Sequence, residues 1–200
     1  SASARRRYVD KELILQILAL IYNSDTGFSS KEIQNFVKTL RNTEIQDTLR
    51  AKIQNACYYL NEAFPKKEKF LKKIHVPMLF YIVLELIEKG ELSRISAVEF
   101  GQWAKIFFDN PPTEYVEACR SSSARKDNVQ KRLSTMKKEF YEYLNEKEAR
   151  ESLNRLKQQI EEESAQNGTV QAEATNNVVN HNETSEIQPV NPTKEQSKIG

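Results

Sequence analysis

The sequence predicts an all-α fold, an irregular helical bundle of about seven helices with a long C-terminal helix and a disordered tail. Three observations predict it. The chain has five glycines and six prolines among 200 residues, and so few chain breakers favour long helices over hairpins. Apolar residues recur at steps of three and four through most of the chain. After residue 163 this periodicity gives way to a segment dominated by Asn, Gln, Thr, Ser and Glu.

The first two helices are expected between residues 10 and 40. Asp10 is a candidate N-cap, and apolar residues follow it at helical spacing as far as Ile21. A polar turn separates this helix from the next. Ser29 and Glu32 then have the spacing of a capping box, in which each side chain accepts a hydrogen bond from the other residue's backbone N–H. The second helix is therefore expected to begin after Ser29.

The third and fourth helices are expected on either side of a lysine-rich turn. The third covers about residues 44–64 and includes Cys57 in its apolar stripe. Pro77 suits the first turn of the fourth helix, where its missing N–H has no helical partner. Gly90 is placed to end that helix. The stretch between them is apolar nearly all round, which predicts that the fourth helix is the central one.

A second capping box, formed by Ser96 and Glu99, opens the fifth helix. This helix carries an aromatic stripe that could line a ligand pocket or pack in the core, and its spacing favours the core. The stripe consists of Phe100, Trp103, Phe107 and Phe108. After the prolines that follow, a short helix is expected over residues 113–119.

The last helix is expected over about residues 124–163, with part of it projecting beyond the bundle because of its length. We therefore predict a helical domain at residues 1–163 and a disordered acidic tail at residues 164–200. The tail holds two lysines and four glutamates, and its composition cannot bury enough apolar surface to offset the chain entropy lost on folding.

Composition and charge argue against a protein that binds nucleic acid over its whole surface, against a membrane protein and against a secreted one. A net charge of +2 gives no reason to expect attraction of the whole surface to nucleic acid. The longest apolar run, residues 76–84, is too short for a membrane span. The first residues have no apolar segment of the kind found in a secretory signal peptide. The two cysteines, Cys57 and Cys119, do not have the CxxC spacing. We expect a cytoplasmic chain with buried thiols and no membrane partner. The absent initiator Met suggests a fragment.

No motif for a metal, a cofactor or catalysis is present. His75 and His181 are the two histidines, and neither belongs to a Cys/His cluster with metal-ligand spacing. The chain also lacks the glycine-rich sequences that cradle phosphates in nucleotide-binding folds. We therefore expect no metal site, no cofactor and no catalytic residue in this chain.

One segment has an unusual local composition, the stretch from residue 120 to residue 132, where cations crowd the expected start of the last helix. A helix N-terminus disfavours cations and favours anions, so their presence suggests a phosphate ligand. Ordinary capping is the alternative, with the cations facing solvent or pairing with Glu117 and Asp127. The candidate phosphate-binding residues are Ser121, Ser122, Ser123, Arg125 and Lys126, with Arg120 and Arg132 as outer contacts.

Four short stretches, in the same order along the chain, resemble the C-terminal helical part of ParB-like proteins related to GmrSD restriction endonucleases. Together they span roughly residues 5–145. The stretches are Tyr115 to Leu133, Arg7 to Leu15, His75 to Tyr81, and Ser96 to Phe100 leading to Phe107-Phe108.

The resemblance implies a bacterial defence or DNA-processing protein whose upstream ParB-like domain carries an Asp-Gly-Gln-Gln-Arg motif. This chain has no Asp-Gly dipeptide and no His-Asn-His nuclease domain, so no catalytic residue is carried over. The expected role is a non-catalytic helical companion of that missing domain, which helps to hold DNA or a nucleotide. A helical scaffold for protein–protein interaction is the alternative. The sequence predicts no oligomeric state.

Overall fold

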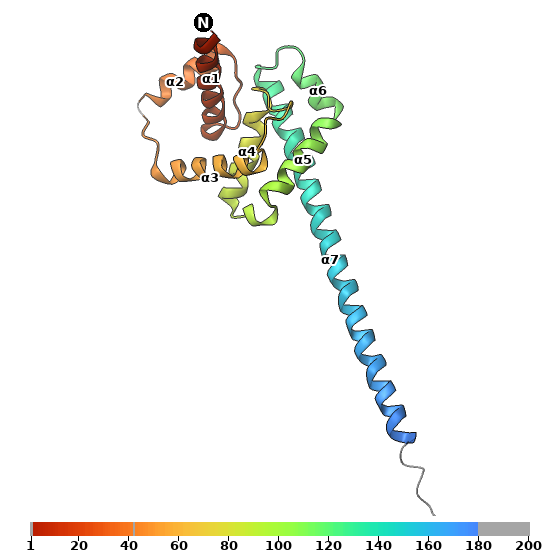
Figure 1. Cartoon of the computed structure of the whole chain (residues 1–200). Helices are drawn as coiled ribbons and strands as arrows, with labels where there is room; N and C mark the ends of the chain where they lie inside the picture. Colours follow the sequence, from red (N-terminus) through yellow and green to blue (C-terminus); the bar gives the residue numbers. More distant parts are fainter. Residues whose placement is uncertain (1, 42, 180–200) are drawn as a thin grey trace, which may run out of the picture. The chain divides into compact units, whose positions relative to one another are not determined.

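The computed structural model describes the backbone of residues 2–41 and 43–179, and the side chains of residues 10–41 and 43–162. Over this part of the chain the secondary structure is entirely helical, which confirms the predicted fold class (Figure 1). The α-helices are α1 Ala2–Tyr22, α2 Ser30–Leu40, α3 Asp47–Ala63, α4 Val76–Lys89, α5 Ala97–Asp109, α6 Thr113–Cys119 and α7 Lys126–Val179, and η1 Leu92–Arg94 is a short 3₁₀ turn.

Both expected capping boxes are present. Ser29 accepts a hydrogen bond from the backbone N–H of Glu32, and the Glu32 carboxylate accepts one from the Ser29 N–H. Ser96 and Glu99 repeat this geometry at the start of α5. The first helix differs from its prediction, because α1 begins at Ala2 and Asp10 lies within it rather than capping it. No proline or glycine lies upstream of Asp10 to stop the helix there.

Helix α4 is the centre of the fold, as the sequence predicts. Eight of its residues are buried, and it packs against α1 and α3. Gly90 ends it in the left-handed conformation, with φ 70°, which glycine adopts without steric cost. The aromatic stripe of α5 is in the core rather than in a pocket, and Phe100 stacks edge-on against Tyr59 and Phe140.

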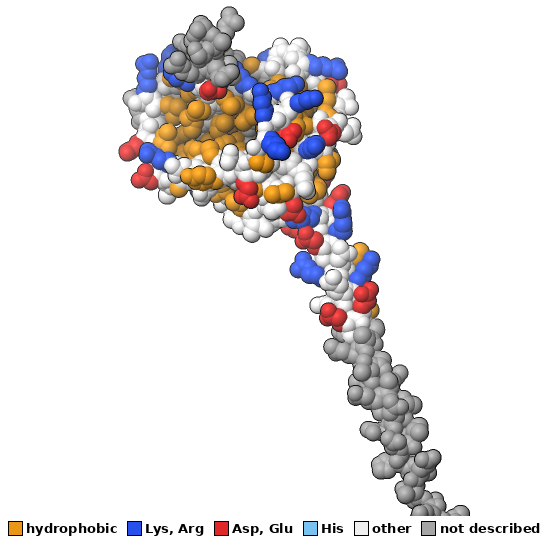
Figure 2. Space-filling view, in the orientation of Figure 1, with side chains coloured by type: hydrophobic (Ala, Val, Ile, Leu, Met, Phe, Trp, Pro, Cys, Tyr) orange, Lys and Arg blue, Asp and Glu red, His pale blue; other side chains and the backbone are white. Residues whose placement is uncertain are grey.

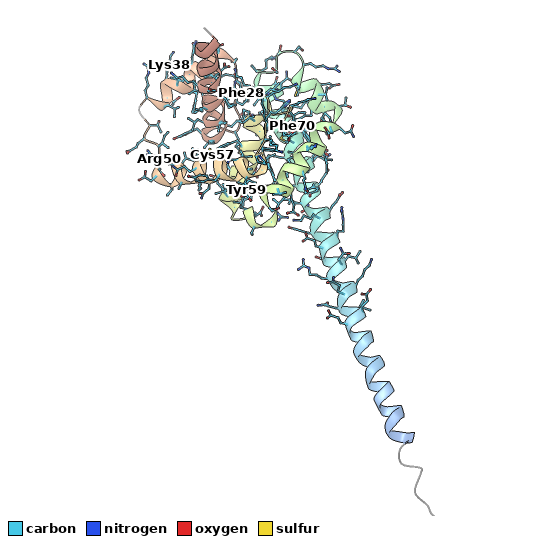
Figure 3. All side chains as sticks on the ribbon, viewed as in Figure 1. Phe28, Lys38, Arg50, Cys57, Tyr59 and Phe70 are labelled. Atoms are coloured by element: carbon cyan, nitrogen blue, oxygen red, sulfur yellow. The ribbon has the colours of Figure 1, made fainter. Side chains whose placement is uncertain are left out.

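Helix α3 corrects one expectation, because Cys57 is exposed rather than buried (Figure 3). The packed face of α3 follows Ile53, Ala56, Leu60 and Ala63, at steps of three and four residues. Cys57 lies one position outside this face. The packing is close at Gly101 of α5, where a Cβ would overlap the Ala63 carbonyl oxygen.

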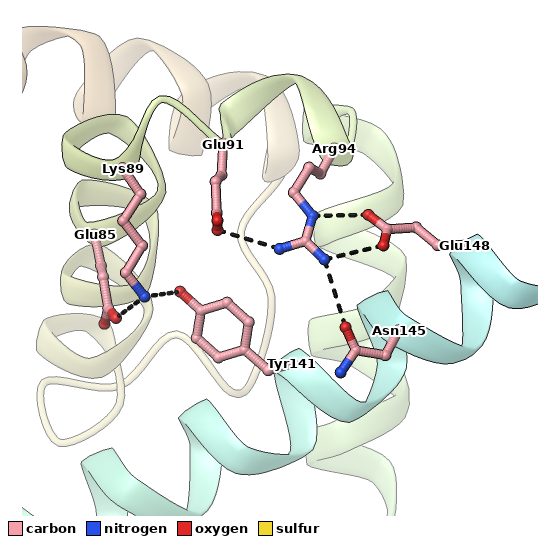
Figure 4. Close-up of polar contacts among 7 residues, drawn as sticks. All are labelled: Glu85, Lys89, Glu91, Arg94, Tyr141, Asn145 and Glu148. Carbon is pink, nitrogen blue, oxygen red and sulfur yellow. Dashed lines mark hydrogen bonds and ion pairs between the residues drawn. The ribbon is translucent and has the colours of Figure 1, made fainter.

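A polar network joins α7 to the end of α4 and to η1 (Figure 4). Lys89 donates to the Tyr141 hydroxyl at 3.2 Å and forms an ion pair with Glu85 at 2.7 Å. The Arg94 guanidinium donates to both carboxylate oxygens of Glu148, at 2.7 and 3.1 Å. These contacts hold the middle of α7, from Tyr141 to Glu148, against the end of α4 and η1.

The chain divides into two compact units, residues 1–148 and residues 149–200. In the second unit the side chains of residues 149–162 are exposed. The helical backbone of α7 continues beyond Glu163 to Val179, into the segment that we expected to be a disordered tail. The rest of that expected tail, residues 180–200, lies outside the described residues. No described helix is long and apolar enough to cross a membrane.

Candidate phosphate-binding turn

The turn between α6 and α7, residues 120–125, is held from inside by its carbonyl oxygens. Asn128 Nδ2 donates to the carbonyls of Ser121 and Ser122, at 3.2 and 3.1 Å. Arg132 Nη1 donates to the Ser123 carbonyl at 2.8 Å. The Ala124 carbonyl accepts from the backbone N–H of Phe28 at 2.7 Å. Every carbonyl oxygen from residue 121 to residue 124 is thus occupied within the protein.

The three serines do not cap α7, contrary to our expectation. The helix begins at Lys126, so the serines lie before the capping position. Ser121 and Ser122 are exposed, and Ser123 is half-buried. Their hydroxyl groups form no hydrogen bond with any described residue. Ser122 has φ 52°, in the left-handed region that residues other than glycine seldom adopt. The helix begins about two residues later than expected, at Lys126.

The exposed cations of the segment are mostly paired with carboxylates. Lys126 Nζ lies 2.6 Å from Asp25, and Arg125 lies 3.7 Å from Asp127. The hydrogen bond to Asp25 raises the pKa of Lys126 above its usual value. Lys131 lies 3.8 Å from Glu117. Two of these pairs are those that ordinary capping predicts. Water screens exposed pairs of this kind and makes them weak, so a phosphate can compete for the cations.

Arg132 is not an outer contact, which corrects our expectation. Its side chain is 1% exposed. Nη1 donates to the carbonyls of Ala118 and Ser123, so the guanidinium ties the last turn of α6 to the α6–α7 turn. The position faces the core because it lies three residues after Val129, which is fully buried on the same face of α7. The structure thus brings residues 120–126 together at the surface and places Arg132 behind them.

Four residues near this turn were not anticipated from the sequence. Asp25 pairs with Lys126 across 101 positions of the chain, and Phe28 donates its N–H to the turn. Glu12 and Lys73 form an ion pair beside Arg132. No sequence signal points to these partners, because they come from α1, the α1–α2 loop and the segment before α4.

His75 pairs with Tyr115. Its Nδ1 lies 2.8 Å from the Tyr115 hydroxyl. Burial, and then the charges of Lys72 and Arg132, lower the pKa of His75 to about 4, so the imidazole is neutral at pH 7. Burial also raises the pKa of Cys119, which opposes formation of a nucleophilic thiolate. Among the described residues, no group of His, Cys, Asp and Glu side chains could hold a metal ion.

Comparison with known proteins gives no match to a protein-family model, a curated protein or a solved structure. The resemblance to ParB-like proteins therefore stays a prediction from the four sequence stretches.

Proposed function

We propose that this chain is a helical binding module that contacts the phosphates of a nucleic acid through the α6–α7 turn. The main support for this proposal is that the carbonyl oxygens of the turn all accept hydrogen bonds from donors within the protein. Carbonyl oxygens repel phosphate, and here all four point to donors within the protein. The serine hydroxyls and the side chains of Arg120, Arg125 and Lys126 are left as the groups available to a ligand.

The resemblance to ParB-like, GmrSD-related proteins supports a more specific form of the proposal. In that form the module accompanies an upstream catalytic domain in bacterial DNA processing or defence against phage. Contacts to phosphate position a nucleic acid without reading its bases, so binding is expected to be weak and largely independent of sequence.

Binding to labelled duplex DNA, measured by fluorescence anisotropy over a range of salt concentrations, tests the proposal. The double substitution Arg125→Ala, Lys126→Ala should weaken binding and reduce the salt slope by about two units, because each lost phosphate contact removes about 0.9 units. Asp25→Asn should have the opposite effect. It releases Lys126 from its ion pair and should strengthen binding.

Lys66→Ala, Lys67→Ala is the matched control, because both lysines are exposed and the change in net charge is the same. This variant should keep the parent's affinity and salt slope. If the two double variants behave alike, or if Asp25→Asn leaves binding unchanged, the turn makes no contact with phosphate.

A protein-interaction module is the second candidate, and exposed apolar side chains favour it. Ile14 and Tyr58 are 56% and 74% exposed. A groove of about 530 Å³ lies between α1 and α2, with Tyr22, Phe36 and Leu40 in its lining. Figure 2 shows hydrophobic side chains gathered on the face formed by α1, α2 and α3. This candidate becomes the better one if the Arg125→Ala, Lys126→Ala variant binds DNA like the parent.

A further inference from the structure

Arg132 is a buried cation without a carboxylate partner. Its side chain is 1% exposed, and the atom Nε is buried with no hydrogen-bond acceptor. Among the described residues, the guanidinium donates hydrogen bonds through Nη1, and both acceptors are backbone carbonyls. The ionisable groups that act on its pKa most strongly are Cys119 and Tyr115, which are neutral at pH 7.

Burying such a charge is unfavourable. The desolvation penalty of one ion in a protein is several kcal/mol, and an ion pair usually offsets it. The Ala118 carbonyl lies in the last turn of α6, where the helix dipole favours a cation, and this offsets part of the penalty. The rest stays uncompensated while Nε has no acceptor. A bound anion would supply the missing countercharge.

A pocket of about 200 Å³ adjoins Arg132, and its lining has the chemistry of an anion site. Pockets for drug-sized ligands measure about 300–1,000 Å³, so this smaller one suits a single phosphate-sized group. Lys73 supplies a second cation, and Gln16, which is 5% exposed, supplies an amide donor. The lining consists of Glu12, Gln16, Phe28, Lys73, Ile74, Ser123, Ala124 and Arg132. Phe28 marks the place of this pocket in Figure 3.

Glu12 is the one acidic residue in this lining, and it contacts two of the polar side chains there, Lys73 and Gln16. Its carboxylate forms the ion pair with Lys73 and accepts a hydrogen bond from Gln16 Nε2 at 3.4 Å. The side chain of Glu12 is 48% exposed and that of Lys73 is 35% exposed, so both can move without disturbing the core. The carboxylate therefore takes the place that an external anion would occupy at Lys73 and Gln16.

We propose that this pocket binds a single phosphate group, which displaces Glu12 from Lys73 and Gln16 and supplies the countercharge of Arg132. Ser123 contributes its hydroxyl group as a further donor. The site is separate from the surface contacts of Arg125 and Lys126, and it goes beyond the function proposed above. This chemistry fits both free inorganic phosphate and the phosphate at the end of a nucleic-acid strand, and the experiment distinguishes the two sources.

The test is the melting temperature of the full chain in inorganic phosphate, compared with sodium chloride at equal ionic strength. A ligand at about 100 times its Kd raises the free energy of unfolding by about 2.7 kcal/mol, so phosphate should raise the melting temperature well above the chloride value. Glu12→Gln, which removes the competing carboxylate, should tighten phosphate binding. Lys73→Met should weaken it by at least about tenfold.

Arg132→Met should abolish the phosphate response, whichever way it changes the melting temperature in chloride. If that variant does not fold, Glu12→Gln and Lys73→Met still decide the outcome, because both positions are partly exposed. Equal melting temperatures in phosphate and chloride, or equal phosphate affinity of the parent, Glu12→Gln and Lys73→Met, would overturn the proposal.

A 5′-phosphorylated oligonucleotide and its 5′-hydroxyl counterpart distinguish the two sources of phosphate. Tighter binding of the phosphorylated strand, lost in Lys73→Met, assigns the pocket to a strand terminus. Equal binding of the two strands, together with a response to inorganic phosphate, assigns it to the free ion. The Arg125→Ala, Lys126→Ala variant should keep its response to inorganic phosphate, so failure of the surface proposal is distinguishable from failure of this one.

Discussion

His75 is a residue at which burial and charge act in the same direction. Burial removes water from the imidazole, and the cations Lys72 and Arg132 further disfavour its protonated form. The pKa of Tyr115 is raised, mainly by burial, so its hydroxyl keeps its proton and can donate to a neutral imidazole. The pair is therefore a structural contact in the core, beside the stacked rings of Phe70 and Phe108.

The lowered pKa of His75 predicts a loss of stability in mild acid. The unfolded chain binds a proton at this residue near pH 6.5, whereas the folded chain does so only near pH 4. Stability is therefore fully present above about pH 6.5 and falls as the pH drops towards 4. Between pH 7 and pH 5 the free energy of unfolding should decrease by about 2 kcal/mol, as measured by urea denaturation.

The chain supplies its own control for this measurement. His75→Gln should remove most of the pH dependence in that window, and His181→Gln should keep it. A slope that persists in His75→Gln and disappears in His181→Gln would contradict this account of the imidazole.

Among the elements, α5 shows how a local start signal also serves tertiary packing. Glu99 accepts a hydrogen bond from the Ser96 backbone N–H, which is the largest cause of its lowered pKa. The same carboxylate pairs with Lys147 of α7 at 3.1 Å. Lys147 also donates to the Arg94 carbonyl. The capping box therefore orders the start of α5 and anchors α7 to it.

Ser96→Ala should lower the free energy of unfolding by about 1 kcal/mol, because the N–H of Glu99 loses its side-chain acceptor. Thermal or urea denaturation measures the change. Ser93→Ala is the control, since Ser93 is exposed and lies before the cap, and its effect should stay within about 0.5 kcal/mol. Equal effects of the two substitutions would show that the box does not stabilise the helix.

At the scale of the whole molecule, the two units differ in how much they contribute to the stability of the fold. The side chains of residues 149–162 are exposed, and they include the apolar residues Leu153, Leu156 and Ile160. Among the described residues, the buried side chains of the core around α4 lie between residues 19 and 144. Stability is therefore expected to come from the first unit.

A chain truncated after Glu163 should melt within about 2 °C of the full chain, because an effect smaller than about 0.5 kcal/mol shifts the melting temperature of a chain of this length by about 1–2 °C at most. Differential scanning calorimetry measures the shift. A fall of many degrees would show that the removed residues pack against the rest of the protein.

Local signals in the sequence predict the helices of the described residues and many of their ends. Steps of three and four residues, the two capping boxes and Gly90 act within a few positions of the chain, so they can be predicted without knowing the fold. Where such signals are absent the boundaries were wrong, as at Asp10 and at the three serines before α7.

The environment of each charged or reactive side chain depends instead on how the helices pack. It buried Arg132 and exposed Cys57, although both lie in helices that the sequence predicts. It also paired Lys126 with Asp25 and Lys73 with Glu12, which are far apart in the chain. The physical reason is that helix periodicity fixes which residues share a face, whereas burial and ion pairing depend on which other helices pack against that face.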